Sequence, residues 1–335
     1  MRRSHVISLF VMFAAVSVFV IVMAFLGRSP ESIISSPTAT NRVVELPSGT
    51  PPQTSGALKP EPTEAPTDEP TAEPTEEPTP TPVVRPEIDP SDFSHLSTKA
   101  YEWSIYGTAK TEGDPETIEY TIDSGALKAA DGYEYIYRIT GGPEKTVYLT
   151  FNLGFEDKTK PTLTILEKLK ANDVKAVFFI AKNYFEENPE IVREIIDRGH
   201  IVGTRGDIFA SGYGGTGMPY LSTEDFSDRM WEIEELYRKI AEKDTRMIFY
   251  RPSAFSSRDM ALAEAMGYKV VFKTYDYYDW DEDVVDRNKA LSQLLKNTRS
   301  GIILQLSSSK VNAEILTDYI VAVKDRGYTF GVPEQ

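Results

Sequence analysis

The stretch TVYLTFNLGFED, residues 146–157, decides how this sequence is interpreted. Its first half is rich in β-branched and aromatic residues and predicts a strand, and Gly154 predicts a sharp turn after it. Enzymes that build a site at the C-terminal end of such a strand usually place a carboxylate there. This sequence has Asn152 and Leu153 instead. The remaining segments must therefore either supply the missing acid or lack it as well.

A strand-then-helix order repeats over about 190 residues from Thr146 to the end of the chain. Short apolar runs predict strands, and apolar residues at helical spacing follow each of them. The predicted strands after the first are AVFFIA (176–181), a short strand within GHIVG (199–203), MIFY (247–250), KVVFKT (269–274), GIILQL (301–306) and YTFGV (328–332). This order predicts an α/β fold with parallel strands, either a distorted (β/α) barrel or a doubly wound sheet.

In a barrel of this kind the functional face lies at the C-terminal ends of the strands. We therefore take the polar residues that follow the predicted strands as candidates for the site. They are Asn152, Arg205 with Asp207, Arg251, Asp276 with Asp279, and Gln305 with Leu306.

The N-terminus predicts a membrane anchor. Residues 6–26, VISLFVMFAAVSVFVIVMAFL, contain no charge and are long enough to cross a bilayer as a helix. Arg2 and Arg3 precede them, so the positive-inside tendency predicts a cytoplasmic N-terminus and an extracytoplasmic C-terminal part. We expect residues 1–28 to be a single-pass signal anchor in the cell membrane; the alternative is a cleaved signal peptide of unusual length.

Residues 29–92 predict a disordered linker. They are poor in apolar residues, and proline recurs at every fourth position from Pro62 to Pro90, as in PTEAPTDEPTAEPTEEPTPTP. Such a tract cannot bury enough apolar surface to fold, and its prolines favour an extended chain. The following residues, 93–145, are aromatic and β-branched and predict an N-terminal extension that packs on the barrel domain, residues 146–335.

The composition excludes several kinds of chemistry. The chain has no cysteine, so disulfides, a thiol nucleophile and thiolate metal sites are impossible. Its net charge of −15 repels phosphate backbones, so we expect no nucleic-acid partner.

Residues 146–332 resemble the NodB-homology polysaccharide deacetylase family, carbohydrate esterase family 4. Five segments carry the resemblance, and the upstream ALKAADGYEYIY together with SSKVNAEIL is most similar to the branch that deacetylates muramic acid in peptidoglycan (the delta-lactam branch). The five segments are VYLTFNLGFED, RGHIVGTRGDIF, FYRPSAF, YDYYDW and GIILQLSSSKVNAEIL.

The resemblance implies a metal-dependent hydrolase. In this family an aspartate and two histidines hold a divalent metal, a second aspartate acts as general base, a late histidine acts as general acid, and an arginine orients the base. The metal would lower the pKa of its bound water while the acid and the base move the protons.

Most of these groups are absent at the matching positions of this chain. Asn152 replaces the base and Leu306 the late histidine. The metal-ligand positions hold Leu153, Arg205 and Phe209, and a permanently charged guanidinium repels a dication. Only Arg251 and the pair Asp279–Trp280 match the family pattern. We therefore predict that the chain has no catalytic residues, no metal and no cofactor; the alternative is a divalent metal such as Zn or Mn in a rearranged site.

The histidines support this interpretation without any alignment. The chain has three, namely His5, His95 and His200. Only His200 falls within the predicted barrel, at a turn position that is not a metal ligand in the family. A zinc site built from cysteine and histidine is therefore excluded there.

The same strand ends contain side chains suited to a glycan. Arginine binds carboxylates and sugar oxygens, and aromatic rings can stack on sugars. The candidate glycan-binding residues are Arg205, Asp207, Arg251, Tyr275, Tyr277, Asp279, Trp280 and Gln305. The alternatives are an ion pair between Arg251 and Asp279, ordinary packing of the rings, and a hard-cation site formed by Asp207, Asp276 and Asp279.

Three functions follow from these observations. The first is a membrane-anchored pseudoenzyme that binds cell-wall glycan (peptidoglycan) or a wall-modifying enzyme. The second is an active deacetylase with a rearranged site, and the third is a structural or sensory domain on a stalk. A fold resemblance does not choose between them, because function depends on the site.

Overall fold

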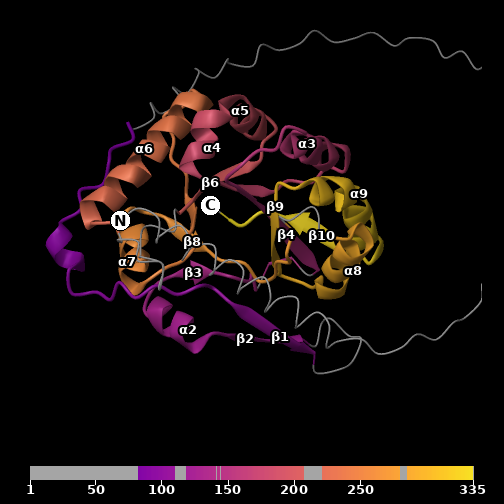
Figure 1. Ribbon diagram of the computed structural model, residues 1–335, viewed down its shortest axis with the longest axis horizontal. Helices are drawn as coiled ribbons and strands as arrows, with labels where there is room; N and C mark the ends of the chain where they lie inside the picture. Colours follow the sequence, from indigo (N-terminus) through magenta and orange to yellow (C-terminus); the bar gives the residue numbers. More distant parts are fainter. Residues whose placement is uncertain are drawn as a thin grey trace, which may run out of the picture. The chain divides into compact units, whose positions relative to one another are not determined.

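The computed structural model describes residues 82–109, 118–140, 142–143, 145–206, 221–279 and 285–334. The strands lie at the centre with helices around them, and the N-terminal extension lies along the lower edge in this view (Figure 1). Among these residues, none of the helices combines the length and the apolar character that crossing a bilayer requires. The predicted anchor, residues 6–26, and most of the predicted linker lie outside the described residues.

The main sheet is parallel at every strand pair that the described residues form. Its order is β10-β4-β5-β6-β7-β8-β3, and β9 pairs with the other edge of β4. The strands are β3 (Tyr135–Ile136), β4 (Thr146–Leu153), β5 (Val177–Ile180), β6 (Ile201–Arg205), β7 (Phe249–Arg251), β8 (Lys269–Val271), β9 (Ile303–Ser307) and β10 (Thr329–Gly331). The predicted parallel α/β order is confirmed.

The sheet curls back towards itself beyond β8. The chain after β8 reaches β9, where Tyr275 pairs in parallel with Leu304. The backbone N–H of Thr274 donates to Ile303 over 2.9 Å, and that of Gln305 donates to Tyr275 over 2.9 Å. This curled parallel sheet is consistent with a (β/α) barrel rather than with a flat, doubly wound sheet.

Helices follow the strands as the sequence predicts, except that the short helix α4 was not predicted. They are α3 (Pro161–Ala171), α4 (Lys182–Glu187), α5 (Pro189–Asp197), α6 (Thr223–Ala241), α7 (Ser257–Ala265), α8 (Arg287–Asn297) and α9 (Lys310–Asp325). Side-chain caps fix several of their starts. Ser222 Oγ accepts from the backbone N–H of Asp225 at the start of α6, and Ser309 caps α9 in the same way. A complete capping box, Ser256 with Asp259, begins α7.

The N-terminal extension completes the sheet. It contains the 3₁₀ helix η1 (Pro90–Phe93), the antiparallel pair β1 (Ile105–Ala109) and β2 (Ile118–Ile122), helix α2 (Ser124–Ala130) and strand β3. β3 pairs with β8, and Arg138 just beyond it forms a bridge to Ile302. The sequence predicts extended structure here and misses α2, a helix of seven residues that Asp123 caps.

Residues 82–93 lie along α6. Arg85 donates to Ser227 Oγ over 3.0 Å and forms an ion pair with Asp228, and the backbone N–H of Val83 donates to Asp244. These contacts are largely exposed. The boundaries of the predicted domains stay predictions, but the last residues of the predicted linker contact the domain.

Side chains alternate between two cores. One face of each strand packs against the helices, with residues such as Phe151, Phe178 and Leu304. The opposite faces gather inside the curl of the sheet, where Tyr148, Val177, Phe179, Phe249, Val271 and Ile303 pack together. Gly203 makes room for this interior, because a Cβ atom there would come within 2.9 Å of the Phe179 ring and 2.8 Å of the Phe249 carbonyl oxygen.

His200 is a buried structural residue that makes stability depend on pH. Its Nδ1 accepts from the backbone N–H of Ala176, which fixes a neutral ring. Burial, assisted by the charges of Lys175 and Arg198, lowers the pKa of His200 from 6.5 to about 4. Between these values the unfolded chain binds a proton that the folded chain does not, so stability falls as the pH falls.

We expect the His200→Asn variant to lose this pH dependence, because an asparagine oxygen can accept the same hydrogen bond without titrating. Between pH 7.5 and pH 5 the parent should lose about 2 kcal/mol more unfolding free energy than the variant. Urea unfolding at both pH values measures this, since carboxylates that titrate in both proteins cancel. Equal losses in the two proteins would contradict the assignment.

Candidate functional site

A cleft of about 1140 Å³ opens at the C-terminal ends of the strands. Residues from five segments that the sequence analysis singled out line it: Asn152, Arg205, Arg251, Asp279, Gln305 and Leu306. The parallel sheet explains this convergence, because the C-terminal ends of all its strands meet at one edge.

Strand alternation sets the inner end of the cleft. Arg251 follows the interior residue Phe249 by two positions, and Gln305 follows Ile303 by two. Side chains two apart on a strand share a face, so both continue the interior of the curl. Asn152 and Arg205 occupy the equivalent positions at the ends of β4 and β6. We call Asn152, Arg205, Arg251 and Gln305 the floor of the cleft.

Arg251 connects strands across the interior. Its Nη1 donates to Thr150 Oγ1 over 2.8 Å and to Asn152 Oδ1 over 3.1 Å, and its Nε donates to the Val271 carbonyl over 3.0 Å. The guanidinium lies 3.9 Å from the centre of the Phe179 ring. Arg251 is 3% exposed, and its Nη2 has no hydrogen-bond partner. Arg251 therefore connects β7 to β4 and β8, and it holds the Asn152 side chain in place.

The floor carries two neighbouring cations. Burial, assisted by the charge of Arg205 and opposed by that of Asp276, lowers the pKa of Arg251 to about 9. At neutral pH Arg251 is still protonated. Arg205 lies against the turn after β4, since a Cβ atom on Gly154 would be 3.1 Å from its Nη1.

Asp279 belongs to a separate buried network at the start of α9. Its Oδ2 accepts from the backbone N–H of Ser307 over 2.6 Å and from Asn312 Nδ2 over 2.7 Å. Tyr277 Oη donates to the other end of the same amide, Asn312 Oδ1, over 2.5 Å. Burial raises the pKa of Asp279 although these hydrogen bonds lower it.

The candidate residues from the sequence separate into three groups. Arg205, Arg251, Tyr277, Asp279 and Gln305 line the cleft. Tyr275 does not line it; the backbone of Tyr275 joins β9, and its ring packs at the edge of the core. Asp207, Phe209 and Trp280 lie outside the described residues.

Two alternatives from the sequence can be compared with the structure. Arg251 does not pair with Asp279, because its partners are uncharged groups and those of Asp279 are Ser307 and Asn312. The suggested cation site also lacks support in the described residues. There Asp276 pairs with Lys273, and Asp207 cannot be placed.

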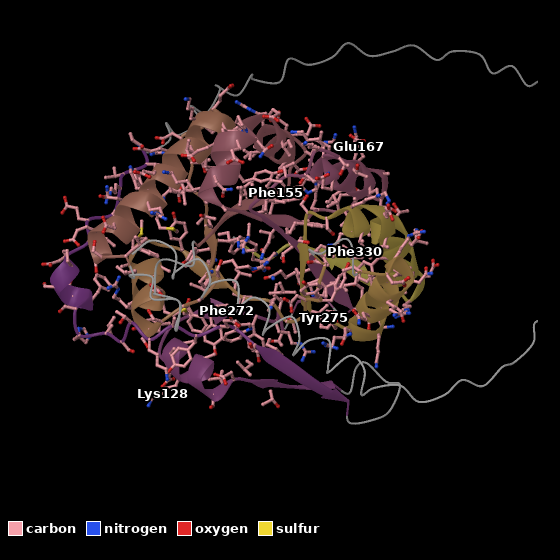
Figure 2. The ribbon with its side chains drawn as sticks, viewed as in Figure 1. Lys128, Phe155, Glu167, Phe272, Tyr275 and Phe330 are labelled. Carbon is pink, nitrogen blue, oxygen red and sulfur yellow. The ribbon has the colours of Figure 1, made fainter. Side chains whose placement is uncertain are left out.

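Sequence reasoning missed one of the two exposed rings at the cleft, that of Phe155. Phe155, on the loop after β4, is 74% exposed, and Tyr278 is 50% exposed. We call these two residues the rim. In Figure 2, Phe155 lies above the centre of the ribbon and Phe272 below it. The position of Phe155 directly after the Gly154 turn is the signal that could have identified it.

Hydrogen bonds of Glu156 hold the loop that carries Phe155. The Glu156 carboxylate accepts from Tyr184 Oη over 2.5 Å and from the backbone N–H of Thr162 over 3.1 Å.

The N-terminal extension contributes the opposite wall of the cleft. Trp103 stacks on Phe272 with ring centres 4.1 Å apart, and its Nε1 donates to the Lys273 carbonyl over 3.0 Å. The sequence could not predict this contact between distant segments.

The described residues of the cleft do not fit a divalent metal. The side chains of Leu153 and Leu306 are both buried in the core that packs against the helices, and neither can bind a metal. Arg205 presents a cation where a metal would need an electron-pair donor. Within the described ranges, no group of three histidine, cysteine or carboxylate side chains could hold a metal ion.

Comparison with known proteins identifies the kind of domain. Residues 140–271 match the family model described as polysaccharide deacetylase. The chain is 28% identical over 190 residues to the peptidoglycan-N-acetylmuramic acid deacetylase PdaA of Bacillus subtilis, which covers 56% of this chain and 69% of that protein. It is 29% identical over 194 residues, with the same coverages, to an uncharacterised 30.6 kDa protein of Geobacillus stearothermophilus.

Solved structures confirm the fold. The structure of Bacillus subtilis PdaA, a family 4 carbohydrate esterase, superposes with a TM-score of 0.60 at 24% identity, over 71% of this chain and 96% of that one. A family 4 pseudoenzyme from Bacillus anthracis gives a TM-score of 0.52 at 23% identity, over 65% of this chain and 74% of that one. At these identities the likeness concerns the fold alone.

The Asp279 network gives a prediction about stability. In Asn312→Ala the buried Asp279 carboxylate loses a donor and Tyr277 loses its acceptor, so we expect a loss of about 1–3 kcal/mol of unfolding free energy. The matched control is Asn297→Ala, which removes an exposed amide bonded to Gln293 and should cost less than about 0.5 kcal/mol. Urea unfolding measures both. Equal effects would mean that the network does not stabilise the wall of the cleft.

Proposed function

The chain carries a polysaccharide deacetylase domain, and from this premise we propose that it is a catalytically inactive member that binds cell-wall glycan through its cleft. One observation carries the proposal. At the strand ends where the family's metal chemistry would be placed, the floor consists of Asn152, Arg205, Arg251 and Gln305.

The missing chemistry supports the absence of catalysis. An amide at position 152 cannot accept a proton as a base, and Leu306 cannot donate one. Arg251 still holds residue 152 through its Nη1, so the framework that would orient a base is kept while the base is absent. The catalytic side chains are absent, whereas the cleft that would hold a substrate is still open.

The cleft has the features of a sugar site. Exposed rings of Phe155 and Tyr278 stand at its rim, and polar side chains line its floor. Rings of this kind combine a large apolar face with little conformational freedom, and protein sites use them as anchors. Glu156 holds the loop of Phe155 in place, so the ring is ordered before a ligand arrives.

The proposed location is the outer side of the cell membrane. The charge-free span at residues 6–26 and the two arginines before it support an anchor with a cytoplasmic N-terminus. The proline-rich segment would then act as a stalk between membrane and wall. The glycan named in the description of the Bacillus subtilis relative is peptidoglycan, and we propose the same polymer as the ligand here.

We expect the double variant Phe155→Ala/Tyr278→Ala to bind isolated wall glycan at least about tenfold more weakly, because it loses both rim rings. The measurement is cosedimentation of the purified full-length protein in detergent with insoluble peptidoglycan. The control is Val321→Ala, which truncates an exposed apolar side chain on α9 away from the cleft. If the double variant binds as well as the parent, the glycan does not use this rim. A parent that does not sediment with glycan at all would favour a wall-modifying enzyme as the partner.

The same protein should retain no divalent metal and release no acetate. We expect elemental analysis after exposure to Zn²⁺ or Mn²⁺ and gel filtration to give far less than one metal per chain, because the floor presents cations and an amide. Acetate release from N-acetylated glycan should equal the blank, with the Bacillus subtilis deacetylase as the positive control. Stoichiometric metal together with acetate release would establish the alternative, an active hydrolase with a rearranged site.

A further inference from the structure

The floor of the cleft presents hydrogen-bond donors where a metal site would present acceptors. Arg251 Nη1 donates to Asn152 Oδ1, so the oxygen of this amide is already engaged. The amino group, Nδ2, is therefore the part of Asn152 that is left for a ligand. An aspartate at this position would offer only acceptors. The exchange of acid for amide thus reverses the hydrogen-bonding polarity at the end of β4.

Arg251 is a buried cation without an anionic partner. It is 3% exposed, and its hydrogen bonds go to a hydroxyl, an amide oxygen and a backbone carbonyl. Its Nη2 has no partner. A buried charge that is not paired with an opposite charge lowers the stability of a protein. An anion that binds next to it would offset this cost.

A second cation strengthens the case. Arg205 lies at the adjacent strand end, close enough to Arg251 for the two charges to repel each other. Like charges at one site favour an anion between or beside them, and guanidinium groups bind carboxylates through two parallel hydrogen bonds. The donor set is therefore complementary to a carboxylate and not to a cation.

Three of the four acidic residues that line the cleft have partners other than Arg251. Asp276 pairs with Lys273, and Asp279 accepts from Ser307 and Asn312. Asp157 accepts from the backbone N–H of Thr159 in its own loop. Glu102 is exposed on the wall that the N-terminal extension supplies. Each of the three aspartates thus has its own partner and is not bonded to Arg251.

We infer that the floor of the cleft binds a carboxylate carried by a sugar, with Arg205, Arg251 and the amide of Asn152 as its donors. The inference rests on the proposed glycan binding and specifies the ligand. The rim rings Phe155 and Tyr278 would contact the sugar, while its carboxylate lies against the two guanidinium groups. The carboxylate can belong to the lactyl ether of a muramic acid or to C6 of a uronic acid, and the experiment separates these sources.

Isothermal titration calorimetry of the full-length protein in detergent tests the inference with two pairs of ligands. The first pair is the disaccharide of N-acetylglucosamine and N-acetylmuramic acid, and the same disaccharide with its carboxylate converted to the primary amide. The second pair is a disaccharide of glucuronic acid and N-acetylglucosamine, and its carboxamide. Each pair differs by one charge at nearly constant shape. In at least one pair the acid should bind tenfold or more tightly than the amide, and that pair identifies the source.

Two variants locate the preference. Asn152→Asp places a carboxylate beside Arg251, so it should fold at least as stably as the parent and lose the preference for the acid ligand. Arg205→Gln should reduce the preference by tenfold or more. The matched control is Lys289→Gln, which removes one exposed positive charge on α8, outside the cleft lining, and should leave the ratio of affinities unchanged. Circular dichroism melting confirms that each variant is folded.

The outcomes separate the inference from the proposed function. Equal affinity for acid and amide in both pairs overturns the inference and leaves glycan binding intact. An acid preference that persists in Asn152→Asp also overturns it, because the carboxylate would then bind elsewhere. If no disaccharide binds and insoluble glycan is not retained either, the proposed function fails together with the inference.

Discussion

A single buried guanidinium organises the functional end of this protein. Arg251 lies inside the curl of the sheet and reaches from β7 to Thr150 and Asn152 on β4 and to the Val271 carbonyl on β8. Strands that are not neighbours are thereby joined by one side chain. Below it, the ring of Phe179 occupies the space that Gly203 leaves open. The floor of the cleft depends on this arrangement, because Arg251 bonds to Asn152 and pairs in register with Arg205.

The same constraint explains how the framework around residue 152 can be kept without a carboxylate there. In the polysaccharide deacetylase family, whose model residues 140–271 match, the resemblance implies an arginine at this position that orients a carboxylate base. Here it holds an amide in the same place. Arg251 makes this hydrogen bond to an amide oxygen, so the packing around residue 152 does not require a carboxylate. Function depends on the site and not on the fold.

The sequence predicted the fold well because its signals are local. Strand runs, helical spacing and the caps at Ser222 and Ser309 can all be recognised from a few neighbouring residues. The short helices α2 and α4 were missed, since six or seven residues give too little periodicity. The residues of the floor were predicted because each follows or ends a predicted strand. The stacking of Trp103 on Phe272 and the exposure of Phe155 depend on tertiary packing, which no local pattern contains.

The way the chain enters the domain has a mechanical consequence. Residues 82–93 lie on α6 through the exposed pair Arg85–Asp228 and a hydrogen bond from Val83, contacts that are individually weak. A pull on the preceding chain is borne first by these contacts, which separate one after another, and only later by the strands. The cleft at the strand ends is thus protected from such a pull, because residues 82–93 would separate from α6 before the force reaches the parallel sheet.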